Sequence, residues 1–303
     1  MPGSAAGLAR SSRRAAVIPP MTAAGPVLIL APHPDDEVVA CGIAAMRAGA
    51  ARPVYVLYLT TGVPRRRGYD ARVARRRKEA LAAAALLRLV PLGFRHAPAR
   101  CLRHELDAAC AEIEATLRSC GASELWVPAF EGAHQDHDAA NALAAAFADR
   151  LPVREFAAYN LVDGRVRANR FAEDRGGERA IEATPGEAAL KRQALALYAS
   201  ERGNLRLFHG GQEIWRQLPS HNYGAPPHRG RLFRERFRWV PFRHPRIDWD
   251  LSAALYHDLG AWISARLAQR AAALGDEPGD ETRQTDGELA SALDEAERER
   301  RVG

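Results

Sequence analysis

The sequence has little lysine, no paired cysteines and no long hydrophobic run. Lys78 and Lys191 are the only lysines among 43 basic residues, so arginine carries almost all of the positive charge, and the net charge is +6. No basic stripe with interleaved aromatic residues accompanies this charge, which argues against a nucleic-acid binder. No apolar run approaches the roughly 18 residues that a membrane-spanning helix needs. We therefore expect a soluble globular protein.

The cysteines and the first residues give little sign of export. Cys41, Cys101, Cys110 and Cys120 lack the Cys-x-x-Cys spacing of a structural zinc site. A domain of this size needs no disulfides, so we expect reduced thiols in a cytoplasm. Residues 1–25 hold no carboxylate, few large apolar groups and no apolar core of a secretory signal. We expect this segment to be disordered.

Short apolar runs alternate with amphipathic stretches in the first half of the chain. The runs at 27–30, 54–59 and 124–127 are typical of buried strands, and Glu155 to Val162 is also strand-like. Helices are expected from Asp36 onward, with Met46 on the apolar face, and at about 70–89, 103–119 and 137–150. This alternation predicts an α/β fold, an open and mostly parallel sheet flanked by helices, within one domain over residues 26–274.

The second half is less regular. Residues 163–182 resemble a polar loop, and a helix is expected over 185–200. Residues 205–249, rich in proline, histidine, arginine and aromatics, predict an irregular C-terminal cap. A C-terminal amphipathic helix follows over 250–274, and the polar residues 275–303 predict a disordered tail.

Two clusters of metal-binding residue types directly follow two of the expected strands. Residues 32–37 read Pro-His-Pro-Asp-Asp-Glu, and residues 134–137 read His-Gln-Asp-His. Ligands of open parallel sheets gather at the carboxyl ends of the strands, so two such loops can converge there. Taken singly, each cluster could merely favour a helix N-terminus. Their joint placement predicts a metal site.

The residue types indicate a catalytic zinc site. His33, Asp36 and His137 would supply two imidazole nitrogens and one carboxylate, with one position left open. Asp35 beside the metal could take a proton from water as general base. His134 could protonate a leaving nitrogen or stabilise an oxyanion, with Asp136 holding its ring. Together these residues predict hydrolysis of an amide.

Both motifs resemble those of the PIG-L/LmbE-like de-N-acetylases, zinc hydrolases that act on N-acetylglucosamine-type sugars. The resemblance covers about residues 26–200 and includes Arg76 and Glu79 in an Arg-x-x-Glu helix. It implies a Rossmann-like fold without a nucleotide, zinc as the cofactor, and the roles given above. Some relatives carry a tyrosine just before the second motif, whereas residues 128–133 contain none.

Four further residues are candidates for substrate binding. Arg76 matches the family's helix and belongs to the basic cluster Arg65–Lys78, which could contact an anionic group or simply be solvated. Lys191 lies in the helix expected over 185–200, where ordinary packing is the alternative role. Tyr223 and His228 fall in residues 219–249, which could line a sugar pocket or form a structural cap.

We therefore expect a zinc-dependent deacetylase acting on an N-acetylglucosamine-type sugar, free or linked to phosphate, lipid or glycoside. Another divalent metal could replace zinc. The alternatives are an amidohydrolase for a non-sugar acylated amine and a non-catalytic protein that holds a ligand through the metal. Asp35 and His134 argue against the last, because a binding protein needs neither a base nor an acid.

Overall fold

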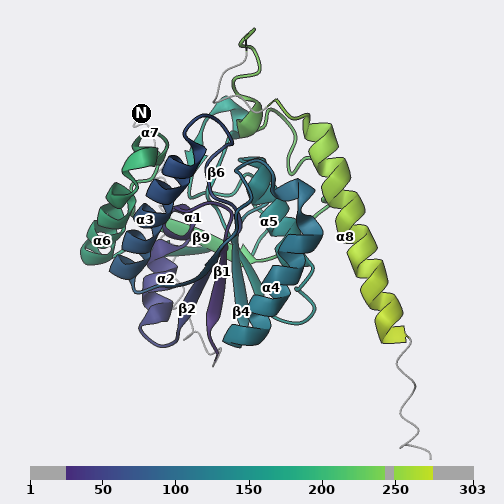
Figure 1. Cartoon of the computed structure of the whole chain (residues 1–303), viewed down its shortest axis with the longest axis horizontal. Coiled ribbons are helices and arrows are strands. Elements are labelled where there is room, and N and C mark those ends of the chain that lie inside the picture. Colours follow the sequence, from purple (N-terminus) through teal and green to yellow (C-terminus); the bar gives the residue numbers. More distant parts are fainter. Residues whose placement is uncertain (1–24, 243–248, 276–303) are drawn as a thin grey trace, which may run out of the picture.

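A seven-stranded sheet forms the centre of the computed structural model, which describes residues 25–242 and 249–275 (Figure 1). Its strand order is β3-β2-β1-β4-β5-β9-β8. The strands are β1 Val27–Ala31, β2 Val54–Tyr58, β3 Val90–Phe94, β4 Glu124–Pro128, β5 Val153–Phe156, β8 Arg179–Glu182 and β9 Gln212–Gln217. A separate two-stranded sheet pairs β6 Tyr159–Asn160 with β7 Arg167–Ala168.

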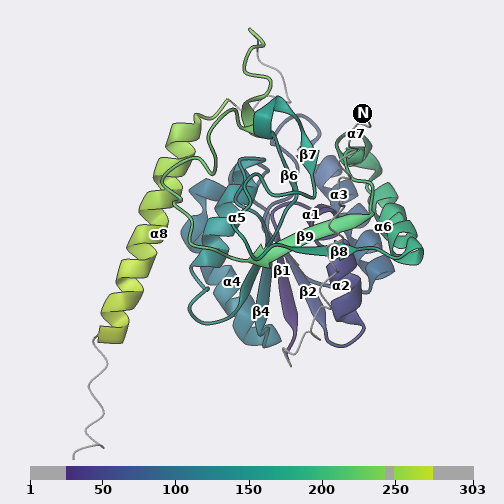
Figure 2. The same ribbon diagram turned by 180° about the vertical axis from the view of Figure 1, so that it is seen from behind.

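The first five strands of the sheet run parallel. β1 lies between β2 and β4, and its register pairs Val27 with Val54 on one side and with Glu124 on the other. All five residues of β1 and of β4 are buried, as parallel strands covered on both faces require. β9 pairs antiparallel with β5, and the edge strand β8 pairs antiparallel with β9 (Figure 2). The fold is the open, mostly parallel α/β sheet that the sequence predicts.

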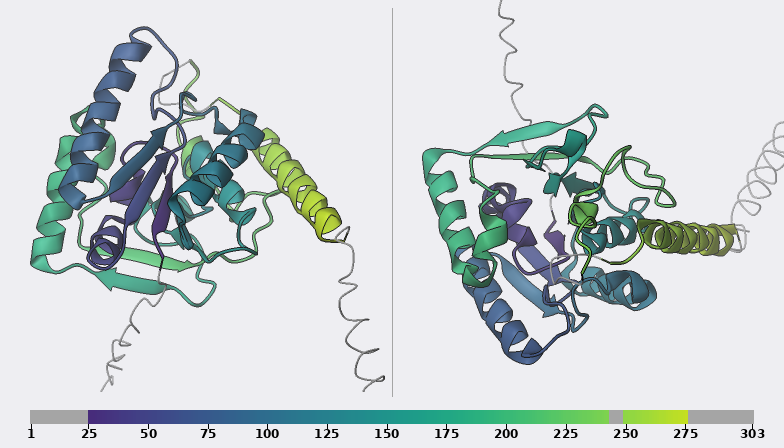
Figure 3. Two further views of the ribbon diagram at one scale, coloured as in Figure 1. Left: turned by 60° about the horizontal axis from the view of Figure 1, so that its bottom comes forward. Right: turned by 90° about the horizontal axis from the view of Figure 1, so that it is seen from above.

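Helices cover both faces of the sheet, as the views in Figure 3 also show. The helices are α1 Asp36–Val39, α2 Gly42–Gly49, α3 Tyr69–Leu87, α4 Leu106–Cys120, α5 Gln135–Ala145, α6 Pro185–Leu197, α7 Arg202–Leu205 and α8 Ser252–Gly275. One apolar core packs α1, α2, α3 and α6 against the sheet, and a second packs α4, α5 and α8 against the other face. None of the helices in the described residues is long and apolar enough to cross a membrane.

The helix expected from Asp36 onward is divided in two, and a contact from a distant strand lies at the break. The break falls at Cys41, between α1 and α2. Glu213 of β9 accepts hydrogen bonds from the backbone N–H groups of Ile43 and Ala44, at 2.7 and 2.9 Å. This carboxylate satisfies the first turn of α2, which otherwise has no acceptors.

Several strands were not expected from the sequence. β3 contains Pro91 and Gly93, which suit an edge strand but weaken the strand pattern. β8 lies in the predicted polar loop, and β9 lies in the predicted irregular cap. The strand expected after Glu155 is divided between β5 and β6. Residues 1–24, 243–248 and 276–303 lie outside the described residues, so the predicted terminal segments stay predictions.

Candidate metal centre and active site

The two motif loops meet at one edge of the sheet. β1 and β4 are neighbours, so the loop after Ala31 and the loop after Pro128 emerge side by side. Three side chains from these loops, His33, Asp36 and His137, each offer a ligand atom, and all three atoms lie within 4.8 Å of one another. The structure therefore brings together the residues that the sequence selects as metal ligands.

Asp36 lies between the two imidazoles. Its Oδ2 is 3.2 Å from His33 Nδ1, and its Oδ1 is 3.2 Å from His137 Nε2. Burial raises the pKa of Asp36, but the two histidines lower it further, to well below its ordinary value. Burial lowers the pKa of His33, while hydrogen bonds to Asp136 and Asp36 raise it to about 10. The imidazoles therefore favour the negative form of Asp36, and Asp36 favours the positive form of His33.

A divalent cation fits this arrangement. Nε2 of His33 lies 3.0 Å from Asp136 Oδ2, an acceptor, so this nitrogen carries the proton. In the neutral ring, the lone pair of Nδ1 then faces the negative Asp36 carboxylate. These two groups repel each other unless a proton or a metal ion lies between them. His137 Nε2 likewise lies 3.2 Å from the other oxygen of this carboxylate, Asp36 Oδ1. Two nitrogens and one carboxylate match a catalytic zinc site.

Asp35 is held beside the cluster with a strained backbone. Its φ of 129° lies in a region that residues other than glycine rarely adopt. Its backbone N–H donates to Glu37 Oε2 at 3.0 Å, and its Oδ2 lies 3.4 Å from Arg76 Nη1. Burial raises the pKa of Asp35 well above its ordinary value, although Arg76 opposes this. Two side chains thus fix the main chain and the carboxylate of Asp35.

Glu37 and Tyr198 form a buried support beneath Asp35 that sequence reasoning missed. The hydroxyl of Tyr198 donates to Glu37 Oε1, and both side chains are fully buried. Burial raises the pKa of Glu37 to about 7. Glu37 belongs to the first motif, but its partner comes from the end of α6, 161 residues later. No local pattern could have identified this pair.

His134 begins α5 and has a defined orientation. Its Nδ1 accepts a hydrogen bond from the backbone N–H of Asp136 at 3.1 Å. In the neutral ring the proton therefore lies on Nε2. Burial lowers the pKa of His134 well below its ordinary value, and His33 and His137 lower it further. The neutral ring can donate one hydrogen bond from Nε2.

Asp136 does not hold His134 in the way that the sequence suggested. Its Oδ2 accepts hydrogen bonds from His33 Nε2 and from the backbone N–H of Arg100, at 3.0 and 2.6 Å. Its Oδ1 accepts from the backbone N–H of Leu102 at 3.1 Å. The distance from Oδ2 to His134 Nδ1 is 3.7 Å, and that nitrogen already accepts from the main chain. The carboxylate therefore orients a metal-ligand candidate.

Comparisons with known proteins agree with this site. Residues 28–148, which include both motifs, match the family model described as PIG-L: GlcNAc-PI de-N-acetylase. The chain carries a PIG-L domain. Among curated proteins, none matches the sequence.

Solved structures of several deacetylases resemble this chain. An antimicrobial pseudoaglycone deacetylase is 20% identical with a TM-score of 0.50, over 64% of this chain and 98% of that one. A deacetylase of teicoplanin biosynthesis is 18% identical with a TM-score of 0.49, over 63% and 98%. The N,N'-diacetylchitobiose deacetylase from Pyrococcus horikoshii is 17% identical with a TM-score of 0.46, over 60% and 72%. With a TM-score of 0.50 at 20% identity, the pseudoaglycone deacetylase shows a fold shared with this chain.

Two of the four substrate candidates, Lys191 and Tyr223, are buried in the interior of the protein. Lys191 is fully buried, and its Nζ donates to Glu213 Oε1 at 2.6 Å and to Val39 O at 3.1 Å. The hydroxyl of Tyr223 donates to Asn141 Oδ1 at 2.6 Å, in the core beside α5. Both side chains are engaged in internal contacts, and their predicted substrate roles stay predictions.

Arg76 and His228 have different surroundings. Arg76 is buried, and its guanidinium donates to Pro34 O, Ser200 Oγ and Glu201 as well as facing Asp35. It therefore contacts the proposed base, whereas its neighbours Arg75 and Arg77 are exposed. His228 lines a pocket in the C-terminal cap. The substrate role of His228 stays a prediction.

Proposed function

We propose that this PIG-L domain is a zinc-dependent deacetylase that removes the N-acetyl group from an N-acetylglucosamine-type sugar or its conjugate. The observation that supports this most directly is the convergence of His33, Asp36 and His137, with ligand atoms within 4.8 Å, at the sheet edge that also carries Asp35 and His134. The family match adds the reaction class, de-N-acetylation.

His33, Asp36 and His137 would hold the metal ion. When bound, zinc polarises the scissile carbonyl and lowers the pKa of the attacking water. Asp136 keeps the His33 ring in the tautomer that leaves Nδ1 available, because its Oδ2 accepts the Nε2 proton. Another divalent ion that accepts two nitrogens and a carboxylate could serve in the same place.

Asp35 acts as the general base in this proposal. It takes a proton from the attacking water as the new C–O bond forms, and the same proton passes to the amine nitrogen as the C–N bond breaks. Glu37 holds the main chain of Asp35, and Arg76 holds its carboxylate. The carboxylate can therefore accept and return the proton at one fixed position. The products are acetate and a free amino sugar.

His134 stabilises the oxygen of the tetrahedral intermediate in this proposal. Because its Nδ1 accepts the Asp136 backbone N–H, the neutral ring offers only an Nε2–H donor. Such a preorganised donor is worth most where charge develops. This orientation favours electrostatic stabilisation over the proton-donating role that the sequence also allowed.

The test is acetate release by full-length protein that has been stripped of metal and then supplied with zinc. Free N-acetylglucosamine and its nucleotide, lipid and glycoside conjugates form the substrate panel. We expect release from at least one of them, only with metal, and loss of zinc binding on His137→Ala. Stoichiometric zinc without acetate release from any sugar would contradict the proposal. Release from acylated amino acids alone would favour the non-sugar alternative.

A further inference from the structure

The turn that follows α6 reaches the proposed base from two directions. α6 ends at Leu197, and residues 198–201 come next and are here called the α6 turn. Three side chains of this turn contact residues that in turn contact Asp35. They are Tyr198, Ser200 and Glu201. The α6 turn lies beyond residues 28–148, which match the family model, so the match does not cover these contacts.

One set of contacts runs through Glu37 to the main chain of Asp35. The hydroxyl of Tyr198 donates to Glu37 Oε1, and the other oxygen, Oε2, accepts from the backbone N–H of Asp35 at 3.0 Å. Tyr198 and Glu37 are both fully buried. Tyr198 therefore fixes the carboxylate that holds Asp35 at a φ of 129°, and such a strained conformation persists only where its neighbours hold it.

A second set of contacts runs through Arg76 to the carboxylate of Asp35. Arg76 is buried, and its Nη1 lies 3.4 Å from Asp35 Oδ2. Its Nε donates to Ser200 Oγ at 3.0 Å, and its Nη2 donates to a carboxylate oxygen of Glu201. The guanidinium is planar and rigid, so these two contacts from the α6 turn also fix the nitrogen that faces Asp35.

Glu79 sets the direction in which Ser200 faces Arg76. Its Oε2 accepts from the Ser200 hydroxyl at 2.5 Å, and its Oε1 accepts from the Ser200 backbone N–H at 3.0 Å. Because the hydroxyl proton points to Glu79, the lone pairs of the same oxygen are available to Arg76 Nε. Arg76 and Glu79 are the Arg-x-x-Glu pair of α3, and the pair thus joins α3 to the α6 turn.

We propose that the α6 turn positions Asp35 for proton transfer. Tyr198 fixes its main chain through Glu37. Ser200 fixes its carboxylate through Arg76. Both are positioning residues, because among the described residues neither side chain hydrogen-bonds to a metal-ligand candidate. The proposal rests on the proposed deacetylase function, and it extends the active site to a segment outside both motifs.

The first test measures acetate release and zinc affinity of zinc-loaded full-length protein in two backgrounds. With Asp35 in place, Tyr198→Phe and Ser200→Ala should each lower kcat about tenfold and leave KM and zinc affinity unchanged, because a base that is slightly out of place takes the proton from water less efficiently. Ser200→Thr, which keeps the hydroxyl, should restore most of the turnover.

In the Asp35→Asn background, neither Tyr198→Phe nor Ser200→Ala should lower kcat further, because the group that they position is gone. His134→Ala should still lower the residual turnover of Asp35→Asn, since it removes the proposed oxyanion donor. That further loss shows that the residual turnover is large enough to measure.

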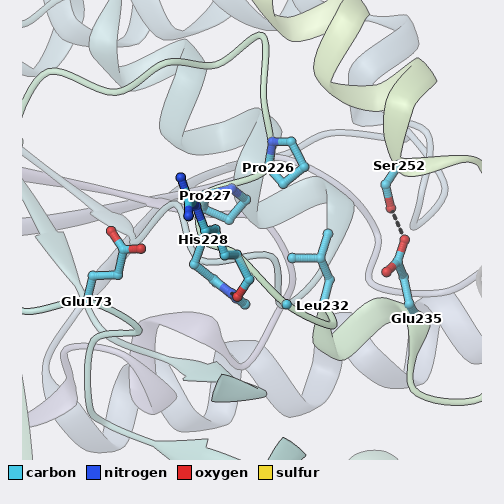
Figure 4. Close-up of a pocket in the computed structure, with 9 residues that line it drawn as sticks. Glu173, Pro226, Pro227, His228, Leu232, Glu235 and Ser252 are labelled. Atoms are coloured by element: carbon cyan, nitrogen blue, oxygen red, sulfur yellow. Dashed lines mark hydrogen bonds between the residues drawn. The ribbon is translucent and has the colours of Figure 1, made fainter. Parts of the chain in front are cut away.

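Two control variants break hydrogen bonds of the same kind elsewhere in the protein. Tyr256→Phe removes a buried tyrosine–carboxylate bond, to Asp138 Oδ2 at 2.9 Å. Ser252→Ala removes a serine–glutamate bond, to Glu235 Oε1 at 2.5 Å, in the C-terminal cap (Figure 4). Any change in kcat that these variants cause should be the same with Asp35 and with Asp35→Asn.

The second test does not depend on acetate release. Crystal structures of the zinc-loaded natural protein and of the double variant Tyr198→Phe/Ser200→Ala compare the geometry of Asp35 directly. We expect one Asp35 conformer with a φ near 129° in the natural protein. In the double variant the Asp35 carboxylate should be displaced or divided between conformers, while the metal ligands stay in place.

The possible results separate this proposal from the proposed function. An unmoved Asp35 in the double variant, equal losses of kcat in both backgrounds, or a change confined to KM would overturn the positioning role even if acetate is released. A displaced Asp35 beside unmoved metal ligands would support it even if no sugar of the panel is deacetylated. Ser200 is exposed, so Ser200→Ala keeps both tests decisive if Tyr198→Phe fails to fold.

Discussion

His33 and Asp136 come from the two motif loops, 103 residues apart, and their side chains meet with Nε2 of His33 3.0 Å from Oδ2 of Asp136. The same carboxylate is fixed by the backbone N–H groups of Arg100 and Leu102. It is therefore a rigid acceptor that orients the first histidine of the cluster. A carboxylate behind a ligating imidazole fixes the tautomer and raises the basicity of the ligand.

Asp136→Asn should weaken zinc binding about 10- to 100-fold, because the amide cannot hold the Nε2 proton of His33 as the carboxylate does. Competition with a chromophoric chelator measures this affinity. Asp149→Asn is the matched control, because Asp149 pairs with Arg270 beyond the far end of α5. If Asp136 acted on His134 alone, turnover would fall and zinc affinity would stay unchanged.

Asp35→Asn should lower kcat by about 10²- to 10⁴-fold while zinc stays bound, because the amide cannot accept the proton of water. Asparagine conserves the shape of the side chain, and it tolerates positive φ better than most residues. Acetate release and metal content measured on the same sample check the prediction. Near-normal turnover in this variant would refute the role of Asp35 as base.

Arg76→Lys should lower kcat about tenfold and change KM little. Arg76 donates to Pro34 O and Ser200 Oγ and faces Asp35 Oδ2 at 3.4 Å, and lysine cannot reproduce this forked set of contacts. Steady-state kinetics distinguish the two roles of Arg76. A rise in KM with normal kcat would restore its role as a substrate contact, and Arg77→Lys is the exposed neighbour for comparison.

Lys191→Met should destabilise the fold by about 3 to 5 kcal/mol, because Glu213 would be left buried without its partner. Denaturant unfolding measures the loss. KM at a temperature well below the unfolding midpoint should not change, since Nζ contacts only internal groups. Lys191→Met combined with Glu213→Gln should recover part of the stability. A normal unfolding free energy with a raised KM would contradict the internal role.

The stability of the protein should fall between about pH 4.5 and pH 8 because of Glu131. Burial raises the pKa of Glu131 from 4.5 to about 8, and Glu155 adds to this, although Asn160 and the backbone N–H groups of Ala158 and Tyr159 oppose it. The folded state therefore binds this proton more tightly than the unfolded chain does. Its contribution is complete below pH 4.5 and is lost as the pH rises to about 8.

Glu131→Gln should flatten this pH dependence, because an amide does not titrate. The change for the natural residue is on the order of a few kcal/mol. Urea unfolding of both proteins at pH 5 and pH 8, at one fixed zinc concentration, measures the difference in slope. An unchanged slope in Glu131→Gln would assign the pH dependence to other groups.

Local patterns accounted for the central part of the fold. β1, β2 and β4 are short, mostly apolar runs, and α3 and α8 lie close to their expected bounds. Their signals come from neighbouring residues, so they can be read along the chain. β3 and β9 lack such signals and form because a sheet edge lies beside them. Likewise, the break between α1 and α2 depends on Glu213, 170 residues away.

The sequence by itself determined which chemical groups stand after β1 and β4, because both motifs are contiguous and follow strands that any parallel sheet would align at one edge. It could not determine how those groups pair. Only the tertiary structure decided that Asp136 holds His33, that Arg76 faces Asp35 and that Lys191 is buried with Glu213. Each of these contacts joins segments far apart in the chain, and such pairings are fixed by packing and burial of the whole domain.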